Sequence, residues 1–99
     1  NFAPLSLRQD TGALWENFFI SERLKANHYN GRNVIPYFWR TTQQQEIDYI
    51  EESDGRFNLF ELKWNPKKAN TVIPKIFAEN YAVETSSVVT PENWLDFLK

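Results

Sequence analysis

The sequence contains no cysteine and no methionine, and its longest apolar runs are short. Without cysteine there are no disulfides to stabilise a secreted fold, and the N-terminus has no basic-then-apolar signal sequence, so we expect a cytoplasmic protein. No run of about eighteen apolar residues occurs, which excludes a transmembrane helix. Because the chain begins at Asn1 and has no methionine, we expect it to be a fragment of a longer protein whose start lies upstream.

The sequence also lacks an excess of positive charge. Its net charge of −2 argues against an autonomous, high-affinity DNA-binding protein, because phosphate contacts require clustered lysine and arginine. It does not exclude a nuclease, whose site is acidic by necessity. A content of 41% hydrophobic and 16% aromatic residues indicates a folded chain rather than a disordered one. Ninety-nine residues allow one domain with one core.

Two apolar segments carry charged residues and form the centre of the prediction. Residues 46–50 and 57–64 have the aromatic and aliphatic composition of β-strands, with a turn signal at 52–55 between them. Residues two apart in a strand share a face, so Glu61 and Lys63 should point the same way. The apolar residues around them predict a central, covered strand. Charges are costly there unless they are paired, bind a metal or take part in chemistry.

The rest of the chain predicts a mixed sheet covered by helices. An N-cap at Asp10 or Thr11 begins the first helix, Asn30-Gly31 gives the turn after it, and Pro74 opens a second helix. The fold class is therefore α/β: a mixed four-stranded sheet with flanking helices, in the order α-β-β-β-α-β-α. The expected elements are helix 10–26, strands 34–41, 46–50 and 57–64, helix 74–81, strand 85–89 and helix 90–98.

The first helix contributes one acid of interest. Glu16 falls between Phe19 and Ile20 on the helical wheel, which predicts a partly covered carboxylate. The four tryptophans are expected to belong to the core and not to serve as base-stacking surfaces. The lone histidine, His28, is expected at the surface.

An acid on one strand and an acid-x-lysine sequence on the next suit metal-assisted phosphodiester hydrolysis. Asp48 and Glu61 would supply hard oxygen ligands to Mg²⁺ or Mn²⁺, and Glu16 would add a ligand from the helix. Lys63 would orient the attacking water or offset developing negative charge.

At these residues the sequence resembles the PD-(D/E)XK nuclease superfamily. More narrowly, it resembles the C-terminal domain of prokaryotic AAA-type ATPases, a domain without a known function. The matching segments are 12–18, 37–41, 46–49 and 61–64. The resemblance implies a restriction-endonuclease-like core over residues 10–99, with 1–9 as a linker from an upstream ATPase domain of the same chain. It implies a nuclease-type catalytic site of Glu16, Asp48, Glu61 and Lys63.

Two hypotheses follow from the resemblance. The first is a Mg²⁺- or Mn²⁺-dependent nuclease domain acting on DNA or RNA. The second is a catalytically silent nuclease-fold module that binds a partner or nucleic acid and regulates the ATPase. The acidic net charge and the absence of glutamine from the Pro74 helix motivate the second hypothesis.

Simpler interpretations of the same residues remain open. Glu61 and Lys63 can form an ordinary ion pair on a solvated strand face, and Glu16 can pair with Arg23. Glu46 and Asp48 can form a charged row that protects an edge strand. Lys67 and Lys68 are candidate nucleic-acid contacts, and a solvated basic patch is the alternative, which also applies to Lys75. Glu51, Glu52 and Asp54 are interpreted as a solvated hairpin tip.

Overall fold

The computed structural model describes residues 7–41, 45–65 and 73–99, with side chains in the first segment from Gly12 onward. The α/β class, the mixed four-stranded sheet and the flanking helices are all confirmed. No helix in the described ranges is long and apolar enough to cross a membrane. The elements in chain order are α1 (Leu7–Tyr29), β1 (Ile35–Arg40), β2 (Glu46–Ser53), β3 (Arg56–Leu62), α2 (Lys75–Asn80), β4 (Ala82–Val89) and the 3-10 helix η2 (Trp94–Leu98).

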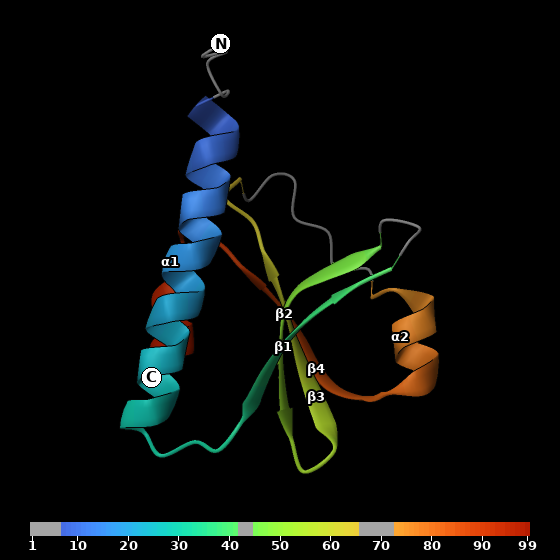
Figure 1. Ribbon diagram of the computed structural model, residues 1–99. Coiled ribbons are helices and arrows are strands. Elements are labelled where there is room, and N and C mark those ends of the chain that lie inside the picture. The colour runs from blue at the N-terminus through green and yellow to red at the C-terminus, as the bar shows by residue number, and fades with distance from the viewer. Residues whose placement is uncertain (1–6, 42–44, 66–72) are drawn as a thin grey trace.

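The sheet has the strand order β1-β2-β3-β4. The pairs β1–β2 and β2–β3 are antiparallel, whereas β3 and β4 are parallel. A parallel pair requires a crossover connection, and α2 lies within it. Figure 1 shows α1 and the C-terminal end of the chain on one side of the sheet and α2 on the other. β3 is therefore central and covered on both faces, as its sequence predicts.

The β2–β3 hairpin closes through a two-residue turn. Asp54 and Gly55 both have positive φ angles, 53° and 75°, and the flanking residues Ser53 and Arg56 are paired. This left-handed geometry matches the twist of antiparallel strands and favours an Asp-Gly sequence. The turn predicted at 52–55 is confirmed.

Each face of the sheet has its own apolar cluster. On the α1 side, aromatic residues of the helix pack on β2, β3 and β4 and are covered by η2. The buried members are Trp15, Phe19, Tyr49, Phe60, Leu62 and Val89. On the α2 side, the buried members are Ile47, Ile50, Leu59 and Phe77. Burial of these two apolar clusters holds α1 and η2 on one face of the sheet and α2 on the other.

A buried carboxylate joins α1 to β2, and it corrects the expectation of a solvated hairpin tip. The Glu51 side chain is 1% exposed. Arg23 donates to it through Nε at 2.9 Å and Nη2 at 3.0 Å, Asn27 Nδ2 at 2.8 Å and Tyr49 Oη at 2.9 Å. Burial raises the pKa of Glu51, but these hydrogen bonds and the Arg23 charge outweigh it and leave the pKa below its usual value. Arg23 thus pairs with Glu51, and the alternative pairing with Glu16 is wrong.

Several boundaries differ from the prediction. The expected N-cap at Asp10 or Thr11 is wrong, because α1 already contains both residues. β3 ends at Leu62, so Lys63 follows the strand instead of lying within it. The last element is a 3-10 helix and not an α-helix. Trp64 is 44% exposed, which corrects its assignment to the core.

Replacement of Glu51 by glutamine should destabilise the fold strongly. The change leaves the largely buried Arg23 guanidinium without its counter-charge, and such losses cost about 3–5 kcal/mol. Glu22→Gln is the matched control: Glu22 pairs with Lys25 at an exposed position of the same helix, so its loss should cost about 0.5 kcal/mol or less. Urea unfolding of both variants measures the difference. Equal stabilities would show that the buried cluster does not hold α1 to the sheet.

Candidate functional site

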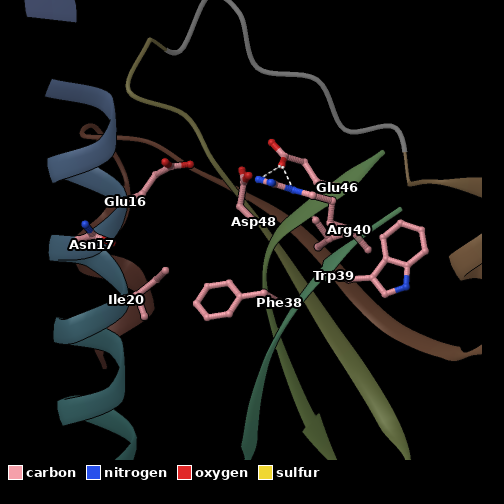
Figure 2. Close-up of a pocket in the computed structure, with 9 residues that line it drawn as sticks. Glu16, Asn17, Ile20, Phe38, Trp39, Arg40, Glu46 and Asp48 are labelled. Atoms are coloured by element: carbon pink, nitrogen blue, oxygen red, sulfur yellow. Dashed lines mark hydrogen bonds and ion pairs between the residues drawn. The ribbon is translucent and has the colours of Figure 1, made fainter. Parts of the chain in front are cut away.

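A β-bulge in β2 sets the direction of Asp48. Between the pairs Tyr37↔Ile50 and Trp39↔Ile47, β1 advances two residues while β2 advances three. Strict alternation would place Ile47 and Tyr49 on one face, yet Ile47 packs on the α2 side and Tyr49 on the α1 side. The extra residue of a bulge re-aims side chains in this way. Figure 2 shows Asp48 pointing towards α1, with Glu16 opposite it.

The Asp48 carboxylate occupies the point where β2 and β3 separate. The last paired residues of this ladder are Tyr49 and Phe60. Beyond them, the backbone N–H of Leu62 donates to Asp48 Oδ2 at 2.8 Å. The side chain therefore continues the ladder after backbone pairing ends, which holds the carboxylate beside the end of β3.

Glu61 and Lys63 form an ion pair next to this point. Lys63 Nζ lies 3.1 Å from Glu61 Oε1, and both side chains are only about one-third exposed. Because Phe60 and Leu62 pack on the α1 side, Glu61 extends from the opposite face, where Ile47 and Ile73 line a shallow depression with it. Asp48 and Glu61 thus leave adjacent strands in different directions at the same end of the sheet.

The two half-buried acids Glu16 and Asp48 both have pKa values above their usual ones. Burial raises the pKa of Glu16, the charges of Asp48 and Glu46 raise it further, and Lys63 opposes them. Burial also raises the pKa of Asp48, and the Glu61 and Glu46 charges add to it. The Leu62 hydrogen bond and the Lys63 charge act against this increase but do not cancel it.

The charges of all three carboxylates raise the pKa of Lys63. Burial lowers its pKa, but the hydrogen bond to Glu61 and the charges of Glu61, Asp48 and Glu16 raise it above the usual value. Lys63 therefore stays protonated at neutral pH. The structure thus brings the four predicted residues into electrostatic contact, from α1, β2 and the end of β3.

An open cavity of about 280 Å³ adjoins the two acids between α1 and β1. Arg40 and Glu46 form an ion pair at one side of it, with Nη2 and Oε2 2.9 Å apart. Figure 2 shows the lining residues Glu16, Asn17, Ile20, Phe38, Trp39, Arg40, Glu46 and Asp48, to which Ile47 also belongs.

Three residues of the cavity were not predicted from the sequence, and two predicted contacts lie outside the described residues. Phe38, Arg40 and Asn17 were not predicted, because nothing in the sequence links β1 to the middle of α1. Lys67 and Lys68, the predicted nucleic-acid contacts, lie outside the described residues. A signal for buried Glu51 was present, since it is two residues from Tyr49 and shares its face.

The carboxylate oxygens of the site determine whether the predicted Mg²⁺ or Mn²⁺ can bind there. Within the described ranges, no group of three or more acidic or histidine side chains is arranged to hold a metal. Mg²⁺ in phosphate-processing sites uses one or two carboxylates and completes its shell with water and substrate phosphate. Asp48 and Glu61 offer hard oxygens of that kind. Asp48 Oδ2 accepts the hydrogen bond from the Leu62 N–H, and Glu61 Oε1 pairs with Lys63. The chemistry of these oxygens suits such a cation, whereas the different directions of the two side chains oppose its simultaneous ligation by both.

The fold and these residues define an α/β domain with a half-buried acid–lysine site at the end of two central strands. The chain belongs to the family described as Domain of unknown function (DUF4143), whose model matches residues 11–94. The match runs from within α1 to the first residue of η2. Searches of curated proteins and of solved structures found no match to the chain.

Asp48→Asn should stabilise the protein at neutral pH. The folded-state pKa of Asp48 lies above its usual value of 3.8, so the charged carboxylate disfavours folding once the pH exceeds the folded-state pKa. A neutral amide removes that penalty. The advantage should shrink as the pH falls through the folded-state pKa and should vanish below 3.8, where the wild-type group is protonated in both states. Thermal unfolding across pH, with exposed Asp96→Asn as control, measures the effect; destabilisation at neutral pH would contradict it.

Proposed function

We propose that this domain is a nuclease-type module in which Asp48, Glu61 and Lys63, assisted by Glu16, support divalent-cation-dependent hydrolysis of phosphodiester bonds in nucleic acid. The observation that carries the proposal is that Lys63, next to the point where β2 and β3 separate, pairs with Glu61 and interacts electrostatically with Asp48 and Glu16. Their sequence order resembles the PD-(D/E)XK pattern, and the element order resembles its restriction-endonuclease-like core. The same resemblance places the domain after an AAA-type ATPase domain, and the sequence without cysteine fits a cytoplasmic location.

Each residue has a role that follows from its surroundings. Asp48 and Glu61 would hold Mg²⁺ or Mn²⁺, with Glu16 contributing from α1. A bound cation of this kind stabilises negative charge on the scissile phosphate and lowers the pKa of an attacking water. Lys63 stays protonated beside both acids, so its ammonium group can offset charge on the phosphate. Burial and the Asp48 charge raise the pKa of Glu16 above its usual value, so its carboxylate would take up a proton more readily than an exposed one does.

A second candidate function is a silent module that binds a partner or nucleic acid and regulates the ATPase. Two observations favour it. Asp48 turns to the α1 side while Glu61 extends from the α2 side, and Lys63 already neutralises Glu61 at 3.1 Å. Both features oppose simultaneous ligation of one cation by the two acids. The two functions therefore differ in whether a cation binds at all.

Lys63→Ala should lower Mn²⁺-dependent cleavage of plasmid or single-stranded DNA by about 10²–10³-fold, the usual effect of removing one transition-state donor. Lys75→Ala is the matched control, because Lys75 is 88% exposed on α2, where it pairs with Glu79 of the same helix. Gel-based nicking assays at equal protein concentration give the rates. Equal cleavage by wild type and Lys63→Ala would exclude the assigned site.

Calorimetry separates the nuclease from the silent module. On the nuclease proposal, Mn²⁺ binds the wild-type protein with heat release or uptake that Asp48→Ala abolishes, because Asp48 supplies a ligand oxygen. Glu84→Ala, which removes an exposed acid paired with Arg56 on the far part of the sheet, should bind as the wild type does. No measurable Mn²⁺ binding by the wild type would favour the silent module.

A further inference from the structure

Phe38 lines the cavity beside Asp48 and belongs to neither apolar cluster of the sheet. Its side chain belongs to an edge strand and is 75% exposed. The next residue, Trp39, packs edge-on against Phe77 at 5.4 Å on the α2 side. Figure 2 shows the Phe38 ring on the other side of β1, turned towards Ile20 of α1. An aromatic ring is thus presented at the cavity instead of being buried in either cluster.

The cavity combines this ring with polar groups from both walls. α1 contributes the Glu16 carboxylate and the Asn17 amide, and β1 contributes the Arg40 guanidinium. A nucleobase offers a π face and a polar edge of donors and acceptors. Aromatic rings stack on the face, whereas amides and carboxylates bond to the edge. The cavity's mixed lining is complementary to both parts of such a ligand.

We propose that this cavity holds one unstacked base of a single-stranded nucleic acid against the Phe38 ring. The inference rests on the proposed function, because Asp48 lines the cavity and also belongs to the site for the phosphodiester. A strand whose phosphate reaches Asp48 and Lys63 would place a neighbouring nucleoside at the cavity. Phe38 is then a substrate-positioning residue that sets specificity for single strands.

Charge and geometry favour a single strand over a duplex. Bases in a duplex are stacked, and a base must leave the stack before an aromatic ring can cover its face. The net charge of −2 supplies no overall electrostatic attraction to the phosphate backbone, on which duplex binding depends. Stacking compensates for weak phosphate contacts, because every base presents a π face whatever its sequence.

The test is binding of a fluorescein-labelled single-stranded DNA of about 12 nucleotides, a length within the usual site range. Fluorescence anisotropy is measured in EDTA, so cleavage does not contribute. Phe38→Ala should raise the Kd about tenfold or more, as loss of one base–aromatic stack does. Phe38→Trp should keep the affinity. The control Tyr29→Ala removes a ring that is 90% exposed at the end of α1 and should leave the Kd unchanged.

Two further probes distinguish base from backbone recognition. An oligonucleotide of equal length carrying abasic sites should bind wild type as weakly as the normal strand binds Phe38→Ala. A duplex of the same sequence should also bind more weakly than the single strand. Equal Kd values for wild type and Phe38→Ala, equal binding of the abasic strand, or no binding of any oligonucleotide would each overturn the inference.

The inference and the proposed function fail in different ways. Binding that depends on Phe38, without cleavage in Mn²⁺ by wild type, supports the base site and rejects the nuclease. Cleavage that Lys63→Ala removes, with Phe38→Ala binding as the wild type does, supports the nuclease and rejects the base site. Lys63 does not line the cavity, so its variant reports on the chemistry and Phe38→Ala reports on the base.

Discussion

The buried Glu51 carboxylate fixes the distance between α1 and β2, and the rest of the structure depends on it. Its hydrogen bonds from Arg23 and Asn27 hold the second half of the helix to the sheet. Arg23 also donates to the backbone oxygen of Phe97, which brings η2 over the same cluster. Glu16 lies seven residues before Arg23 and so shares its side of the helix. The hydrogen bonds that Glu51 accepts from Arg23 and Asn27 therefore hold α1 in the position that places Glu16 opposite Asp48.

The buried Glu51 and the half-buried Asp48, both on β2, show how the surroundings of a carboxylate decide whether its charge stabilises the fold. Glu51 is surrounded by donors and its pKa falls, whereas Asp48 has a single backbone N–H and faces other carboxylates, so its pKa rises. Glu51 therefore contributes stability at neutral pH, and Asp48 opposes it. Residues whose charge is unfavourable in the fold are common in sites that bind or react, since a ligand can relieve the repulsion. That contrast supports assigning the site to Asp48 and not to Glu51.

Sequence patterns predict the element order well, because the strands are short apolar runs separated by turn residues such as Asp54-Gly55. They also predict the half-burial of Glu16 from its place on the helical wheel. The direction of Asp48 could not be predicted, since it depends on a bulge created by the pairing of β1 with β2. The burial of Glu51 was missed because charged residues near a hairpin are usually solvated. Its partner Arg23 lies 28 residues away on α1.

The proposed nuclease function requires a cation to bind where β2 and β3 separate. Titration of Mn²⁺ into isotope-labelled protein tests it directly, because the ion broadens the amide signals of nearby residues. The account predicts selective loss of the Asp48, Leu62 and Lys63 signals at low Mn²⁺, with Glu84 unaffected. Equal broadening of all amide signals, no broadening, or broadening confined to exposed acids such as Asp96 would contradict a cation site at Asp48 and Glu61.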